Sequence, residues 1–146
     1  MLVVGLLAVA AVPALKRHAF SSRAAAVSSD LRAFAAAFQA YAREHGDWPA
    51  GGTPPGVLPP GMDGYLPPAR WARVTPIGGH YQFATQSPQA GARYAAVIII
   101  APSRGQRASS DYRQLSDIDT RLDDGNLATG NFFLGYRNYP VFVLEH

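Results

Sequence analysis

The chain has 146 residues, a length sufficient for one domain with a modest core. Its formal net charge is +3, and 16% of its residues are charged. It contains no cysteine, so disulfides, catalytic thiolates and cysteine-ligated metals are excluded. Lysine and arginine form no long run, and no specific nucleic-acid partner is predicted.

Residues 1–15 carry no charged or polar side chain, and the basic pair Lys16-Arg17 ends this apolar run. A membrane-spanning helix needs about 20 apolar residues, and this run is shorter. A cleaved signal peptide is the alternative interpretation, but no positive residue precedes the run. We therefore predict that residues 1–15 form an apolar helix that packs in a filament core or anchors in a membrane. Its packing residues are Met1, Leu2, Val3, Val4, Gly5, Leu6, Leu7, Val9, Val12, Pro13 and Leu15.

A helical pattern continues to His45 without a break, so the predicted helix has roughly 45 residues and a length of about 65 Å. Gly46 is a natural C-cap, and Pro49 prevents continuation. Spacings of three and four residues place five apolar side chains on one face, which we expect to pack on a sheet. They are Val27, Leu31, Phe34, Phe38 and Tyr41. Residues 16–146, including this second half of the helix, are the predicted globular head.

Residues 46–79 are rich in proline and glycine and are predicted to be loop. A loop of this length needs fixed points on the core, for which the large side chains are candidates: Trp48, Tyr65, Leu66 and Trp71.

The remaining residues predict strands at 80–85 and 93–100, with a turn at 87–91. The second strand is almost wholly apolar, so both of its faces should be covered. A helix is expected over 109–122, capped by residues 109–111, with one face shared by Tyr112, Leu115, Ile118 (or Asp119) and Leu122. Strands at 131–134 and 139–144 follow. This order predicts an α+β fold, in which the long helix packs on a small antiparallel sheet.

Three segments resemble the type IV pilin superfamily, which includes the pseudopilins of type II secretion. Gly5 and Pro13 have the spacing of the glycine and proline in the apolar pilin helix. Residues 37–49 match the helix exit A-x-x-x-Y-x-x-x-x-G-x-[YW]-P. Residues 119–132 are similar to the stretch D-x-K-[IL]-D-D-G-x-x-x-T-G-x-[VF] near the C-terminus of many pilin-like proteins, with Arg121 at the lysine position.

The resemblance implies a pilin-like fold and a structural, non-enzymatic role. The chain would polymerise through its apolar helix into an extracellular filament, after anchoring in the inner membrane. Its partners would be copies of itself and a pilus or secretion assembly machinery. The alternatives are a pseudopilin of a type II secretion-like machine and an exported, membrane-anchored binding domain. The family register places the mature N-terminus upstream of Met1.

Oxygen-bearing side chains gather at and beyond the end of the second predicted helix, and they make calcium, a hard cation, the one candidate cofactor. Some pseudopilins bind calcium in a C-terminal loop. The candidate ligands are Asp117, Asp119, Asp123, Asp124 and Asn126. The alternative is a helix end followed by an Asp-Asp-Gly turn without a metal. The four histidines are scattered, and neither a nucleophile elbow nor a phosphate-binding loop is present, so no catalytic site is predicted.

Overall fold

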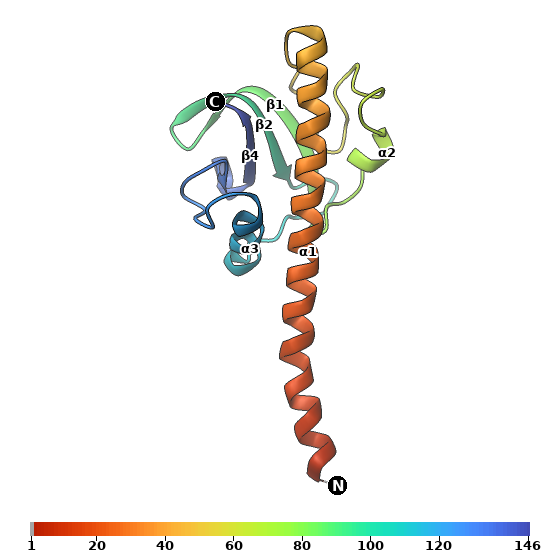
Figure 1. Cartoon of the computed structure of the whole chain (residues 1–146), viewed down its shortest axis with the longest axis vertical. Coiled ribbons are helices and arrows are strands. Elements are labelled where there is room, and N and C mark those ends of the chain that lie inside the picture. The colour runs from red at the N-terminus through yellow and green to blue at the C-terminus, as the bar shows by residue number, and fades with distance from the viewer. Residues whose placement is uncertain (1) are drawn as a thin grey trace.

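The structure is a computed structural model that describes the backbone of residues 2–146 and the side chains of residues 12–146. A long N-terminal helix and a four-stranded antiparallel sheet make an α+β fold, as the sequence predicts. The lower half of the helix projects from the head, and the upper half lies on it (Figure 1). The elements are α1 (Leu2–His45), α2 (Pro68–Trp71), β1 (His80–Gln89), β2 (Ala92–Ala101), α3 (Tyr112–Leu122), β3 (Phe132–Leu134), a 3-10 turn (Tyr136–Asn138) and β4 (Pro140–Glu145).

The sheet has the order β1-β2-β4-β3, and every neighbouring pair is antiparallel. The β1–β2 hairpin is longer than predicted, because pairing continues through Ser87, Pro88 and Gln89. Only Ala90 and Gly91 form the turn, both with positive φ. The expectation that residues 87–91 form the turn was therefore wrong. Proline is tolerated within β1 because β1 is an edge strand.

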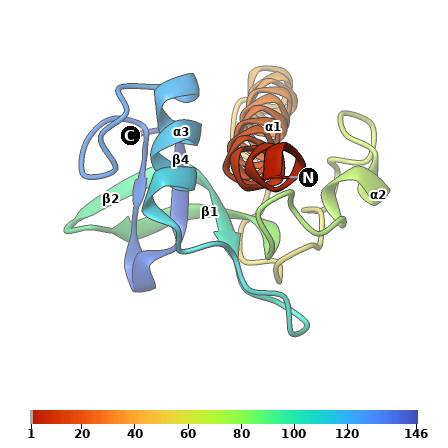
Figure 2. The same cartoon turned by 90° about the horizontal axis from the view of Figure 1, so that it is seen from below.

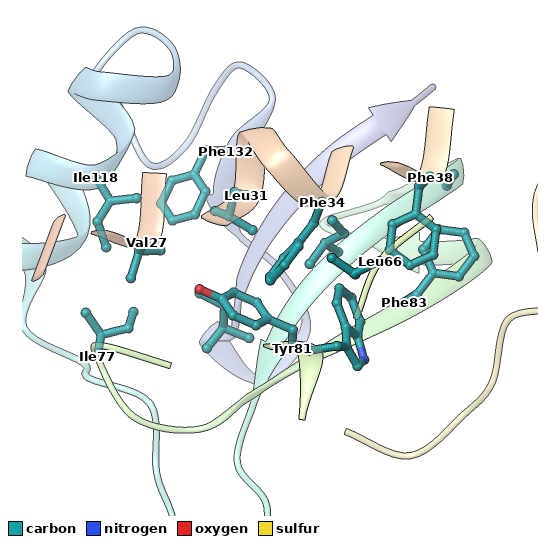
Figure 3. Close-up of a cluster of buried hydrophobic side chains, with 14 of the residues drawn as sticks. Val27, Leu31, Phe34, Phe38, Leu66, Ile77, Tyr81, Phe83, Ile118 and Phe132 are labelled. Atoms are coloured by element: carbon teal, nitrogen blue, oxygen red, sulfur yellow. The ribbon is translucent and has the colours of Figure 1, made fainter. Parts of the chain in front are cut away.

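The second half of α1 packs on one face of the sheet through the predicted stripe. Val27, Leu31, Phe34 and Phe38 are each at most 1% exposed. These side chains point from α1 toward the sheet, where they meet side chains from β1 and the 46–79 segment (Figure 3). Tyr41, the last predicted member, is only partly buried and packs at the edge of the core.

Aromatic rings form the centre of this core. The Phe34 ring lies 5.1 Å from the Trp71 ring and 4.9 Å from the Tyr81 ring, both in edge-to-face geometry. The Phe38 ring stacks on Phe83 at 4.3 Å. Such pairs stabilise a core by about 0.5–1.5 kcal/mol each beyond the area they bury. The contacts join α1 to α2 and β1, two segments that lie well beyond it in the sequence.

Both faces of β2 are covered, as its apolar sequence predicts. Ile98 and Ile100 belong to the core beneath α1. Val97 and Ile99 belong to a second cluster on the opposite face, with Phe133, Val141 and Val143. Seen along its long axis, the molecule has α1 and α3 side by side on the same side of the sheet (Figure 2).

The 46–79 segment is fixed to the core as expected, although it is not wholly loop. Trp71 is fully buried, and Leu66 is 3% exposed. Trp48 and Tyr65 are partly buried against the same core. The single turn of α2 was not predicted from the sequence, although it begins at a proline, a residue favoured at the first helical position. The complete burial of Met62 was not predicted either.

Helix α3 begins where the sequence predicts, because the Asp111 carboxylate accepts hydrogen bonds from the backbone N–H groups of Arg113 (2.9 Å) and Gln114 (3.3 Å). The predicted apolar face is correct for Leu115 and Ile118 but wrong for Tyr112. Tyr112 is 62% exposed, and Gln114 is buried instead.

Candidate functional site

The first half of α1 projects from the head (Figure 1). Residues 12–19 are all exposed, and the first fully buried residue of the helix is Ala24. Val12 is 53% exposed and Leu15 is 67% exposed. Together with the exposed Pro13, they are the predicted packing residues whose side chains the structure describes. Met1 and the side chains of Leu2, Val3, Val4, Gly5, Leu6, Leu7 and Val9 lie outside the described part.

The apolar character of this surface continues in the sequence toward the N-terminus, since residues 1–15 contain no polar side chain. Within the part of the chain that was described, no helix is both long enough and hydrophobic enough to be a candidate membrane span.

Three hydrogen bonds hold α1 to α3 where α1 leaves the head. The Gln114 side chain donates to the backbone carbonyl of Phe20 at 2.8 Å. The Arg121 guanidinium donates to the Ser21 hydroxyl at 2.9 Å. Arg32 donates to the backbone carbonyl of Arg121. Because these bonds lie on either side of Ala24, they fix the direction in which the projecting segment leaves the head.

A second polar contact holds the middle of α1 on its other side. The Asp30 carboxylate pairs with Arg70 at 3.2 Å and accepts a hydrogen bond from the Tyr81 hydroxyl at 3.1 Å. Burial, and then the negative charge of Asp30, raise the pKa of Tyr81 above its ordinary value. The Arg70 guanidinium also lies over the Phe34 ring, 5.3 Å from its centre. Arg70 is thereby engaged within the head.

The loop that follows α3 is held by its own side chains. The Asp123 carboxylate accepts a hydrogen bond from the backbone N–H of Asn131. Gly130 has a positive φ, which favours glycine, and a Cβ atom there would displace the Asp123 carboxylate from its hydrogen bond. The loop residues that match the pilin-like stretch thus have a direct structural role.

The Asp124 carboxylate is a second group that holds this loop. It accepts hydrogen bonds from the Thr129 hydroxyl (2.7 Å) and the Asn126 backbone N–H (2.8 Å). These bonds, the Thr129 bond first, lower the pKa of Asp124. Leu127, only 4% exposed, attaches the loop to the core.

Three carboxylates meet at the end of α3. Asp119, Asp123 and Asp124 each place an oxygen within 4.8 Å of the others. Asp119 is fully buried, and neither of its oxygens has a hydrogen-bond partner. Burial, followed by the charges of Asp124 and Asp123, raises the pKa of Asp119 to about 6. This arrangement accommodates either a proton or a hard cation among the oxygens.

The predicted calcium set is only partly brought together. Asp119, Asp123 and Asp124 cluster, whereas Asp117 pairs with Arg121 at 3.4 Å along α3. The Asn126 side-chain oxygen accepts a hydrogen bond from the Ala128 N–H at 3.1 Å. Calcium binding stays a prediction, now centred on Asp119.

The sequence matches no protein-family model and no curated protein. The resemblance to pilins therefore stays a hypothesis that rests on the quoted motifs and on a compatible arrangement of helix and sheet.

Proposed function

We propose that this chain is the structural subunit of an extracellular filament of the type IV pilin class, anchored in the inner membrane before assembly. The observation that carries the proposal is the projecting half of α1, whose described apolar side chains Val12 and Leu15 lie exposed beyond a well-packed head. A helix exposed in this way needs an apolar environment, because each Å² of apolar surface in water costs about 25 cal/mol.

A bilayer and a bundle of identical helices both supply that environment. Transfer of the segment from one to the other exchanges one apolar contact for another, so the hydrophobic effect does not oppose assembly. Addition of each subunit by the same non-symmetric contact then produces an open helical polymer, provided that the rotation between neighbours does not close into a ring. The head would form the outer surface of this polymer.

The firm attachment of α1 to the head supports a role in assembly. The Gln114–Phe20 and Arg121–Ser21 hydrogen bonds fix α3 against α1 next to the projecting segment. A fixed angle between helix and head is what a regular polymer requires, because an error in that angle would accumulate over successive subunits.

The proposal is tested by electron microscopy of material sheared from producing cells, with N-terminal sequencing of the protein it contains. Thin fibres that contain this chain with its apolar segment retained are the expected result. Leu15→Asp should abolish the fibres, because it places a charge in the apolar contact. Val57→Asp, which changes a 40% exposed valine on the head, is the matched control and should preserve fibres.

The alternatives give different outcomes. A pseudopilin would appear in short fibres that require a secretion machine. An exported binding domain would appear as a soluble monomer that begins after Ala14, and this outcome would overturn the filament proposal.

A further inference from the structure

A basic groove lies between α1 and α3, next to the apolar segment. It has a volume of about 430 Å³, and its α1 wall includes Lys16, Arg17 and Phe20. Its α3 wall is formed by Arg113 and Asp117. The two walls come from helices that lie side by side on the sheet (Figure 2), so the groove exists only in the folded head.

The groove carries an excess of positive charge. Its one carboxylate, Asp117, already has a partner in Arg121 at 3.4 Å. Among the residues that the structure describes, Lys16, Arg17 and Arg113 form no ion pair. Like charges in one groove repel one another. An anion bound there would relieve this repulsion.

The position of Arg113 adds to this argument. It lies in the first turn of α3, where the helix dipole favours acidic side chains and disfavours basic ones. Arg113 is exposed, so packing in the core does not account for a cation at this position.

The neighbouring sequence indicates where the anion comes from. Residues 1–15 are wholly apolar, and Lys16 follows directly. A 15-residue helix is about 22 Å long, shorter than the hydrocarbon layer of about 30 Å. When such a helix enters a bilayer from one side, the residues that follow it lie at the level of the lipid phosphates.

We infer that Lys16, Arg17 and Arg113 form a site for the phosphate group of an anionic phospholipid, occupied while the subunit awaits assembly. The inference rests on the proposed function, because it requires residues 1–15 to enter a bilayer. A short apolar anchor holds a protein weakly, and a basic patch supplies the second attachment that stable anchoring needs. Phe20 and Pro13, which also line the groove, provide apolar surface beside the bound headgroup.

The test is flotation of the full chain with vesicles of phosphatidylcholine alone and of phosphatidylcholine mixed with phosphatidylglycerol. The wild-type chain should partition more strongly into the mixed vesicles. Each cation removed should lower this preference about fivefold, so that Lys16→Gln/Arg17→Gln/Arg113→Gln abolishes it. The matched control is Arg93→Gln/Arg104→Gln/Arg107→Gln, which removes equal charge from exposed arginines outside the groove and should retain the preference.

Arg113→Gln alone is the most informative variant, because Arg113 reaches the groove only through the fold. A loss of preference equal to that of Arg107→Gln would indicate general charge attraction and overturn the site. Binding of inorganic phosphate that depends on these cations, without any preference for phosphatidylglycerol vesicles, would overturn the assignment to lipid. Unchanged melting temperatures of the variants would show that folding is intact.

The vesicle readout does not require filaments. If the chain forms filaments but shows no preference for phosphatidylglycerol, only this inference fails. If the preference depends on the three cations and no filament forms, only the proposed function fails.

Discussion

The side-chain amide of Gln114 donates a hydrogen bond to the backbone carbonyl oxygen of Phe20, 2.8 Å away and 94 residues earlier in the chain. Gln114 is 1% exposed, whereas Phe20 is half-buried, so the bond is partly shielded from water. It joins α3 to the point at which α1 leaves the head. A polar residue that was not among the predicted members of the buried face of α3 is thus buried.

Gln114→Ala should lower the free energy of unfolding by about 1–2 kcal/mol, because the substitution removes a buried hydrogen bond and leaves a small void. Urea unfolding measures this change. Tyr112→Ala is the control, since Tyr112 is 62% exposed in the same helix, and it should have an effect below about 0.5 kcal/mol. Equal effects of the two substitutions would contradict the role of the Gln114 bond.

Phe34→Ala should destabilise the head by about 3–5 kcal/mol, because it leaves a cavity between the Trp71 and Tyr81 rings. The Arg70 guanidinium would also lose the ring beneath it. Thermal unfolding monitored by near-ultraviolet circular dichroism reports this loss. Val12→Ala, in the projecting segment, should leave the melting temperature of the head unchanged, and a comparable loss there would refute the separation of the two halves of α1.

Periodic apolar positions allowed the stripe of α1 and the strands to be predicted. The spacing of Val27, Leu31, Phe34 and Phe38 places all four side chains on one face of a helix, and all four are buried. The Asp111 cap and the double-sided burial of β2 also follow from local chemistry. These features could be predicted because each is determined by residues close together in the sequence.

Features that depend on distant partners were not predictable. Gln114 is buried because a carbonyl of α1 lies above it, and no local pattern signals that carbonyl. Asp119 was named as a calcium candidate, but its complete burial arises from the fold of the 123–131 loop over the end of α3. The groove between Lys16 and Arg113 was missed, because the two residues are far apart in sequence.

Asp119→Asn should stabilise the head at neutral pH in the presence of a chelator. The folded-state pKa of Asp119 is raised to about 6 from the ordinary value of 3.8, so the folded state binds the proton more tightly than the unfolded state. The wild-type free energy of unfolding should therefore fall as the pH rises from about 4 to about 6, and then stay level. The variant should lack this decline and gain roughly 1–3 kcal/mol at pH 7. Parallel pH profiles of the two proteins would contradict the assignment.

Calcium should stabilise the wild-type head at neutral pH. A cation among the oxygens of Asp119, Asp123 and Asp124 would offset their mutual repulsion and satisfy the unpartnered Asp119 oxygens. At a calcium concentration about 100 times the dissociation constant, the gain should be about 2.7 kcal/mol. Thermal unfolding with added calcium chloride, compared with the chelated protein, measures it.

The matched variants for calcium are Asp119→Asn and Asp117→Asn, which remove the same charge from the same helix. Asp119→Asn should abolish the response, because it replaces the buried carboxylate with a neutral amide that has only one oxygen. Asp117→Asn should retain it, because Asp117 pairs with Arg121 and lies outside the cluster. If the two variants respond equally, calcium acts through the general charge of the head, and if the wild-type protein does not respond, the calcium prediction is wrong.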